Sequence, residues 1–339
     1  MTTTAPATTP ITTPANTPVT AASTVDRRYD LVMLFDVTDG NPNGDPDAGN
    51  QPRTDPQTLQ GLVTDVCIKR KIRNAVAAIK GTEPGYDLFF QTQDAVYEKR
   101  ILNTLIEGGF DAAGIDKKKF SEKKGPDKIA DSEKARIMLL KNFYDLRAFG
   151  AVLSTGDFNC GQVRGPVQLT FARSLDAILT LEPAITRKSL TTVADAESQV
   201  KKDGYITGTM GRKQIIPYAL YRAHAFINPL LARSTGFTFA DLALFVQACT
   251  NMFELDRSAS RGTMTLRALH CFQHETALGN APAHKLFDLV HTPPLGADAA
   301  PRTFGDYSSS LTFDATKLPE GVAHRELINS PTAGNVFPF

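Results

Sequence analysis

The chain has 339 residues, of which 42% are hydrophobic, enough to bury a sizeable core in one large domain or two small ones. Its 37 Lys and Arg residues nearly balance 36 Asp and Glu residues, and this formal net charge of +1 excludes a uniformly basic surface, so any nucleic-acid contact must come from local clusters. No stretch is long and apolar enough to span a membrane and the first residues lack the pattern of a secretory signal, so we expect a cytoplasmic protein.

The chain opens with a low-complexity segment. Residues 1–25 are mostly Thr, Ala and Pro and carry no charged side chain. Such a composition cannot bury enough apolar surface to offset the entropy of ordering, so we expect a disordered tail. Order is expected to begin near Arg27.

A strand and a helix are predicted first. Leu31–Val37 is a short apolar run that ends in turn residues, which favours a buried strand. After a loop over residues 39–56, Thr64 is a plausible N-cap, and apolar residues then recur every three or four positions from Ile68 to Ile79. This spacing predicts a helix that packs on the sheet.

Cationic side chains lie beside the apolar face of this helix. Lys69, Arg70, Lys71 and Arg73 can contact successive phosphates, and Arg164 lies on the polar face of a later strand. Cations beside an exposed sheet suit single-stranded RNA, whose backbone is tracked electrostatically. The aromatic octamer of ordinary RNA-recognition motifs is missing, so base stacking of that kind is not expected. The alternative is a solvated helix face.

The loop after the first strand is rich in Asp and Asn. Asn41, Asn43 and Asp45 can order it through side-chain turns, which we take as the leading interpretation. An EF-hand is the second, although the twelfth position of the loop is not Glu. In the third, Asp39, Asp45 or Asp47 holds Mg²⁺ for cleavage of RNA.

Residues 85–142 are helical in pattern but polar, which suggests an inserted, solvated subdomain. Its central part, Asp116–Lys128, contains many lysines and a few acidic residues. This segment is either a charged solvated face or a finger that faces nucleic acid. The finger candidates are Lys117, Lys118, Lys119, Lys123 and Lys124.

The rest of the chain mixes strands and helices. We predict strands at 146–153, 162–173, 214–226 and 264–274, a glycine-rich exposed loop at 203–213 and a helix at 239–255. The order β-α-(insertion)-β-β-(loop)-β-α-β favours a ferredoxin-like or RRM-like α+β sheet with helices on one face and the polar face open. Beyond residue 293 we expect an irregular C-terminal extension.

Nothing in the chain calls for a cofactor or a metal. No G-x-G-x-x-G follows the first strand and no G-x-x-x-x-G-K-[ST] occurs. The four cysteines are scattered without a C-x-x-C, which is typical of reduced, buried thiols. No Ser/His/Asp or Cys/His arrangement emerges, so we expect no catalytic residue.

Several long motifs occur in an order that is specific to one family. They are Leu31–Val37, Asn41–Asn50, Val63–Arg73, Arg147–Ala151, Cys160–Gln168, Met210–Lys213 and Phe253–Gly262. Together they resemble the backbone subunit of the type I-C CRISPR Cascade complex, the Csd-two branch of the Cas-seven superfamily. The resemblance covers roughly Arg28 to Val290, and the two ends of the chain match nothing in it.

The resemblance implies an RRM-like palm over residues 26–292. It also implies a finger insertion at about 85–142 and a thumb at about 176–214. Subunits of this kind polymerise helically along CRISPR RNA, present it for pairing with target DNA in antiviral defence, and bind other Cascade subunits. They are not nucleases. The alternative is a metal-dependent RNA endonuclease of the type III backbone kind, and a plain scaffold with incidental basic patches is the third possibility.

The resemblance also implies residue roles. The basic helix would grip guide phosphates, Met210 would be a candidate wedge at the thumb, and the finger lysines would lie near the duplex of guide and DNA. The full set expected on RNA is Lys69, Arg70, Arg73, Arg164, Tyr205, Met210, Arg212 and Lys213.

Overall fold

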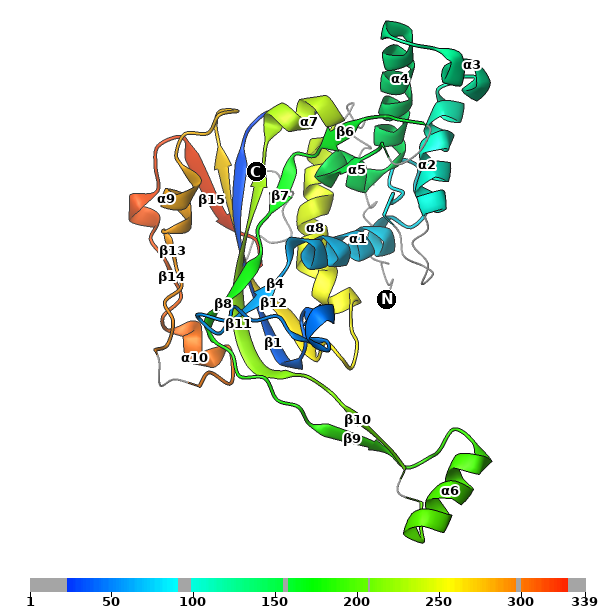
Figure 1. Ribbon diagram of the computed structural model, residues 1–339. Helices are drawn as coiled ribbons and strands as arrows, with labels where there is room; N and C mark the ends of the chain where they lie inside the picture. Colours follow the sequence, from blue (N-terminus) through cyan, green and yellow to red (C-terminus); the bar gives the residue numbers. More distant parts are fainter. Residues whose placement is uncertain (1–22, 91–98, 155–157, 207, 297–299, 329–339) are drawn as a thin grey trace, which may run out of the picture.

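A mainly antiparallel sheet forms the centre of the molecule (Figure 1). The computed structural model describes residues 23–90, 99–154, 158–206, 208–296 and 300–328. Within them, seven strands lie in the order β15-β12-β1-β11-β8-β4, with β7 paired to one end of β11. The strands are β1 (Tyr29–Gly40), β4 (Gln60–Val63), β7 (Val167–Leu169), β8 (Ala172–Ala177), β11 (Ile216–Ile227), β12 (Thr263–His274) and β15 (Val322–Glu326).

Strand β1 is the middle of this sheet. It pairs antiparallel with β11 on one side and with β12 on the other. Every residue from Tyr29 to Val37 is buried. A strand that is covered on both faces reads as a continuous apolar run, which is why the sequence indicated a buried strand here.

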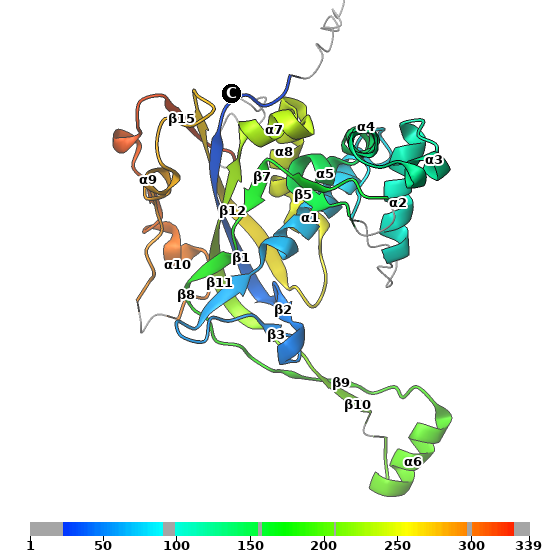
Figure 2. The ribbon, with the colours of Figure 1, turned by 45° about the horizontal axis from the view of Figure 1, so that its top comes forward.

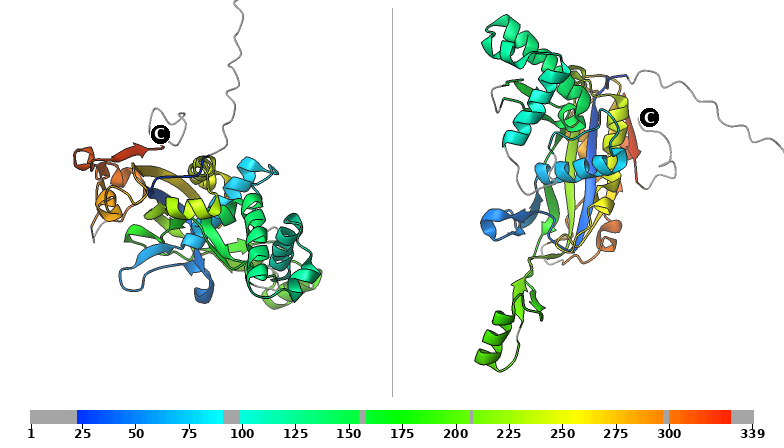
Figure 3. Two further views of the ribbon diagram at one scale, coloured as in Figure 1. Left: turned by 90° about the horizontal axis from the view of Figure 1, so that it is seen from above. Right: turned by 90° about the vertical axis from the view of Figure 1, so that its right-hand side faces the viewer.

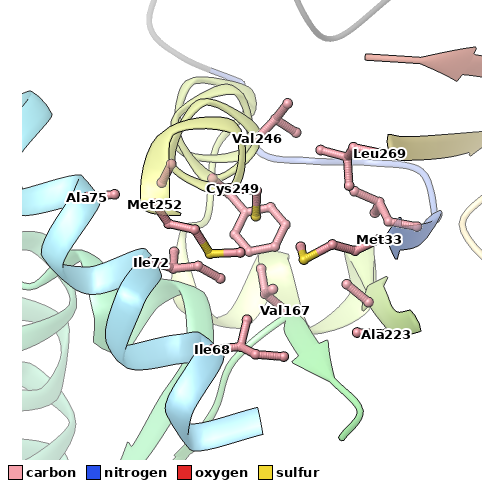
Figure 4. Packing of buried hydrophobic residues seen from close by; sticks show 14 of the residues in the cluster. Met33, Ile68, Ile72, Ala75, Val167, Ala223, Val246, Cys249, Met252 and Leu269 are labelled. Carbon is pink, nitrogen blue, oxygen red and sulfur yellow. The ribbon is translucent and has the colours of Figure 1, made fainter. Parts of the chain in front are cut away.

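Two helices cover one face of the sheet (Figures 1 and 3). They are α1 (Asp65–Lys80) and α8 (Phe239–Leu255). Ile72 of α1, Met252 of α8 and Met33 of β1 meet in the core between them (Figure 4). The side chain of Thr64 caps α1 as predicted, and α8 begins with a capping box.

The other face of the sheet is covered as well, which corrects two expectations. Short elements within residues 283–296 and 300–317 cover it and bury the other side of β1 in a second apolar cluster, where Val32 and Leu34 meet Leu286 and Tyr307. The polar face is therefore not open, and the described residues beyond 293 include regular elements, among them β15, which joins the sheet beside β12. The covering elements are α9 (Ala283–Phe287), β13 (Val290–His291), α10 (Gly305–Ser308), β14 (Thr312–Phe313) and the short helix η2 (Ala315–Lys317).

Residues 99–142 build a separate helical lobe. It consists of α2 (Lys99–Ala112), α3 (Lys117–Glu122) and α4 (Pro126–Asn142). The lobe has its own core, in which Phe110, Phe120 and Leu139 are fully or almost fully buried. In Figure 1 it projects to one side of the sheet.

The segment that returns from this lobe differs from its prediction. Instead of a strand over 146–153, it forms the buried helix α5 (Tyr144–Phe149) and then the short strand β5 (Gly150–Val152). β5 pairs with β6 (Gln162–Arg164), and the predicted strand 162–173 breaks into β6, β7 and β8. Phe171 lies between β7 and β8 and is 52% exposed.

A thin arm extends from the opposite end of the sheet (Figure 2). It is made of β9 (Ala184–Arg187), α6 (Val193–Asp203) and β10 (Thr209–Arg212). None of these elements contains a buried residue. A two-stranded hairpin with one short helix and no core is marginal in water on its own.

Order begins slightly earlier than expected. Val25 is fully buried, its amide donates to the carbonyl of Phe237, and Thr24 bridges Thr238. The last residues of the expected tail are therefore fixed at the start of α8. Residues 1–22 lie outside the described part of the chain. Helix α7 (Pro229–Thr235) precedes this contact.

Candidate nucleic-acid interface

The expected cations of α1 already have partners within the chain. Lys69 pairs with Asp65 at 2.9 Å between Nζ and Oδ2 and stays partly accessible. Arg70 donates from Nη1 to the carbonyl of Phe90 at 2.9 Å. Both side chains are half-buried and keep part of their surface exposed.

Arg73 is different, because its guanidinium is buried. Its Nε donates to Oδ2 of Asp145 at 2.8 Å, and the group stacks on the rings of Phe90 and Phe149. The Asp145 carboxylate also accepts the amides of Phe89 and Phe90. Arg73 therefore does not lie on the open row of cations that the sequence suggested.

Asp145 and Arg147 of α5 join the helical lobe to the sheet and its helices. Arg147 forms a two-pronged ion pair with Asp241 of α8, at 2.8 and 3.3 Å, and donates to the carbonyls of Gly85, Leu140 and Lys141. Charged groups that are this well bonded fix the backbone around them. The position of the lobe is thus set by two buried polar residues to which the sequence analysis gave no role, although Arg147 begins one of its motifs.

Lys71 of α1, which the sequence grouped with the cations that can contact phosphates, is buried as well. Its Nζ is buried and lies 2.7 Å from Oδ2 of Asp256, which Arg261 contacts as well. Burial, and then the charge of Arg261, lower the pKa of Lys71 to about 8. This cluster ties α1 to the loop after α8, and its only sequence signal was a charge on an otherwise apolar helical face.

Arg164 lies on β6 beside the junction of α5 and β5. Its side chain is exposed, and its strand partner is Gly150. Glycine is required at this partner position, because its φ is +78° and a Cβ there would meet the carbonyl of Val163 at 2.3 Å. Arg164 is therefore an exposed cation whose strand partner is a backbone position that only glycine can occupy.

The remaining expected RNA residues lie on or beside the arm. Tyr205 is 66% exposed and Met210 is 77% exposed. Arg212 makes a loose pair with Glu182 at 3.5 Å, while Lys213 at the root of the arm donates to the carbonyl of Ala259. The arm thus presents apolar and cationic side chains together, far from α1 in the chain and on the opposite end of the molecule from the helical lobe (Figure 1).

The expected finger lysines form two groups. Lys117 pairs with Asp111 at 3.0 Å and Lys123 pairs with Asp131 at 2.5 Å, so part of the local charge is neutralised. Lys118, Lys119 and Lys124 lie on α3 and just after it, at least partly exposed. The accessible charge of this run is therefore smaller than the sequence suggests.

The Asp- and Asn-rich loop is held by its own side chains. Asn43 accepts from both the amide and the hydroxyl of Thr64, and Asn41 donates to the carbonyl of Asn50. Asp45 caps the one-turn helix η1 (Pro46–Ala48), which lies between the two-residue strands β2 (Gly44–Asp45) and β3 (Gln51–Pro52). This is the turn chemistry that the sequence analysis favoured.

The same loop offers poor support for a metal. Asp45 pairs with Arg53 at 3.5 Å. Throughout the described ranges, no three His, Cys, Asp or Glu side chains gather closely enough to hold an ion. No helix in those ranges is long and apolar enough to cross a membrane.

Comparison with known families gives a clear result. Residues 27–312 match the sequence model described as CRISPR-associated protein Cas7. The chain belongs to the Cas7 family. The match extends past Val290, where the resemblance noted in the sequence ended. The family region therefore includes α9, β13 and α10 on the second face of the sheet.

Individual relatives are distant. The CRISPR-associated protein Cas7 of Haloferax volcanii is 26% identical over 238 residues, which cover 66% of this chain and 63% of that protein, slightly under two thirds of its length. A chain of a solved "CRISPR RNA-guided surveillance complex, pre-nicking" superposes with a TM-score of 0.48 at 16% identity, covering 75% of this chain and 79% of that one. A chain of a second "CRISPR RNA-guided surveillance complex" gives 0.42 at 15% identity, covering 80% and 77%. At these values neither structural likeness bears on the function of this Cas7-family protein.

Proposed function

We propose that this Cas7-family chain is the guide-binding backbone subunit of a type I-C Cascade surveillance complex. Family membership over residues 27–312 carries the proposal. The finer assignment to type I-C rests on the seven motifs in the sequence. In this role the chain binds CRISPR RNA without cutting it, meets target DNA through the guide, and contacts other Cascade subunits.

The sheet is the proposed RRM-like palm. Its strands β12, β1, β11 and β8 lie side by side, every neighbouring pair is antiparallel, and both main helices cover one face. Antiparallel strands with two helices on one face are the layout of the ferredoxin-like β-α-β-β-α-β unit. The helical lobe within residues 85–142 is the proposed finger, and the arm within 176–214 is the proposed thumb.

The arm supports assembly with copies of the same chain. Its apolar side chains are displayed instead of buried, and a patch of this kind marks an interaction site. The exposed apolar side chains of the arm are Ile185 (51% exposed), Val193 (76%), Val200 (47%), Tyr205 (66%), Ile206 (51%) and Met210 (77%). A neighbouring subunit that covers them supplies the burial that the arm lacks.

The proposed guide contacts are the accessible cations and the arm. Lys69, Arg70 and Arg164 hold phosphates on the palm, while the side chains of the arm act at the next subunit. Arg73 is left out of this set because its charge is used by Asp145. The accessible finger lysines face the duplex formed with target DNA. The accessible residues of the arm and finger are Tyr205, Met210, Arg212, Lys213, Lys118, Lys119 and Lys124.

The test combines Lys69→Ala with Arg212→Ala in the full chain. We expect weaker binding of guide RNA for every spacer sequence, and a salt slope that is shallower by roughly 0.7 for each phosphate that is no longer neutralised on a single strand. Lys80→Ala, which removes a surface pair with Glu83 and a contact with the ring of Tyr86 at the end of α1, is the matched control. Weakening confined to some spacer sequences would contradict backbone binding.

The endonuclease alternative has its own assay. Assembled complex is incubated with complementary RNA and Mg²⁺, and we expect no cuts at regular intervals. Regular cuts that disappear in an Asp39→Ala or Asp45→Ala variant would favour the enzyme instead.

A further inference from the structure

Loop 256–262 connects α8 to β12 and takes no part in the proposed guide contacts, although it belongs to one of the motifs of the sequence. β12 begins at Thr263, opposite Thr38 of β1, and β11 begins at Ile216, opposite Gly40 of β1. The loop therefore lies at the end of the sheet from which the arm leaves (Figure 1). There it meets α1, the Asn-rich loop and the root of the arm.

The inner side of the loop is anchored by a buried charge of α1. The side chain of Lys71 is only 1% exposed, and its Nζ lies 2.7 Å from Oδ2 of Asp256 at the start of the loop. Arg261, near the end of the loop, contacts the same carboxylate. Charge-assisted contacts of this kind hold their partners in a narrow range of positions. Asp256 thus closes the loop on itself and ties it to the helix that carries Lys69 and Arg70.

The loop also packs backbone to backbone on the end of β1. The amide of Asn41 donates to the carbonyl of Ser260 at 2.9 Å. Gly262 has a φ of +61°, and a Cβ there would lie 2.3 Å from the carbonyl oxygen of Thr38. A Cβ on Gly40 would likewise overlap the backbone of the loop. Because a side chain at either glycine would push the two segments apart, the loop has one seat on β1.

The exposed side of the loop contacts the root of the arm. Nζ of Lys213, the first residue after β10, donates to the carbonyl of Ala259. An ammonium group has three N–H donors, so Lys213 can make this contact and also contact a phosphate. The two strands of the arm join the sheet at Leu181 and Ile215, whose amides and carbonyls exchange hydrogen bonds of 2.8 and 3.0 Å. Because a hairpin without a core is marginal in water, its direction depends on such contacts at its root.

A small rotation at this root moves the whole arm. From Lys213 back to Thr209 the strand spans roughly 13 Å at about 3.3 Å per residue, and α6 lies further out. The displayed apolar side chains of the arm, Met210 among them, move with it. The contacts of loop 256–262 therefore determine where the arm meets a neighbouring subunit.

We propose that loop 256–262 is the joint that fixes the direction of the arm relative to α1 and the sheet. In this joint Asp256 and Lys71 are positioning residues, which act on the spacing of successive subunits without touching the guide themselves. A functional element stays in place only when the residues behind it are themselves fixed. The inference rests on the proposed function, because the direction of the arm sets a spacing only where one subunit reaches the next along a guide.

The experiment titrates the full chain into two labelled RNAs of mixed sequence. One RNA is short enough to hold a single copy and the other is long enough to hold several, which size-exclusion chromatography verifies. Asp256→Asn removes the charge that pairs with Lys71 and Arg261 but keeps the shape of the side chain. It should leave the affinity for the short RNA and its salt slope unchanged. It should raise the concentration that half-saturates the long RNA by at least about fivefold, because the contact between subunits is weakened.

The second readout is the interval between protected positions when nuclease digests the long RNA. The wild-type chain should give a regular interval and Asp256→Asn an irregular one, while Asp256→Glu, which keeps the carboxylate, should restore regularity. Lys213→Met removes the exposed contact of the joint and leaves the buried pair intact. It should also make the interval irregular, which the loss of a single phosphate contact would not do. Glu254→Gln removes an exposed carboxylate that pairs with Arg257, and as the matched control it should change neither readout.

The outcomes separate the joint from the proposed function. If thermal unfolding shows that Asp256→Asn does not fold, the interval in Lys213→Met decides the question alone. Equal weakening of both RNAs by Asp256→Asn, together with a regular interval in Lys213→Met, means that the cluster only stabilises the fold, and it overturns the joint. A regular interval in both variants overturns the joint as well and leaves the proposed function standing. A wild-type chain that binds neither RNA overturns the proposed function and the joint together.

Discussion

Neighbouring cations of α1 differ in burial, since some form ion pairs at the surface and others form them in the interior. Lys69 forms a surface pair with a residue four positions away, whereas Lys71 and Arg73 are buried against partners 185 and 72 residues away in the chain. Helical spacing shows that such residues are close to each other but says nothing about a distant carboxylate. The sequence could therefore predict the basic helix but not which of its charges remain available.

The buried pair of Arg73 and Asp145 gives a prediction about stability. Arg73→Ala should lower the free energy of unfolding by about 3–5 kcal/mol, because it leaves the carboxylate of Asp145 buried without its counter-charge. Chemical denaturation measures the change. Arg257→Ala, which removes an exposed pair with Glu254, should cost no more than about 1 kcal/mol. Equal effects of the two substitutions would refute a structural role for Arg73.

Long elements with one apolar face were predictable from the sequence, and short ones were not. The strand around Leu31–Val37 and the helix over 239–255 follow directly from hydrophobic pattern, and the structure confirms both. Helix α5 has only six residues and all of them are buried, so no periodicity separates it from a strand. The strands that cross 162–173 are interrupted twice, which a single alternating pattern does not reveal.

The edge strand β15 is attached through a pair of histidines. His270 of β12 and His324 of β15 lie 3.1 Å apart between Nδ1 and Nε2, and Phe313 stacks on His324. The pKa of both imidazoles is lowered from 6.5 to about 4, and burial is the largest cause. The charge of Arg222 contributes to the lowering for His270, and His270 contributes to it for His324, where Glu326 opposes it. Both rings are therefore neutral in the folded protein at pH 6.

This difference makes stability depend on pH. Between pH 6.5 and about 4 the unfolded chain binds more protons at these histidines than the folded chain, so stability falls as the pH falls through this window. Each pKa unit corresponds to about 1.4 kcal/mol. The urea midpoint should therefore be lower at pH 5 than at pH 7. His324→Phe should reduce the pH dependence, the exposed His284→Gln should not, and an unchanged slope in the first variant would refute the explanation.

Both faces of the central sheet are covered by other elements of the chain. Because α1 and α8 lie on one side and the elements from α9 to η2 on the other, no broad sheet face is left open for RNA within the described residues, as the sequence analysis had expected it to be. Contacts with nucleic acid must therefore come from the rim of the sheet, the helical lobe and the arm. Only the assembled fold shows this, since each covering element is short and ordinary in the sequence.

The N-terminal tail can be tested at this scale. Deleting residues 1–22 should leave assembly with guide RNA unchanged in size-exclusion chromatography, because the described contacts of the N-terminus begin at Ser23. Deleting residues 1–26 should lower the thermal unfolding midpoint, because it removes the buried Val25 and its hydrogen bond to Phe237. Failure of the shorter deletion to assemble would show that the tail makes contacts of its own.

If the chain assembles into the proposed helical row, the arm also determines how that row ends. A contact in which one protomer reaches onto the next is not self-complementary, so it repeats in one direction and, in an open helical row, never closes on itself. Every row then has one terminal arm with Met210 and its neighbours still facing water. Further copies would keep adding there unless a different protein occupies that position, so the length of the row requires a dedicated terminator, as solenoids require caps.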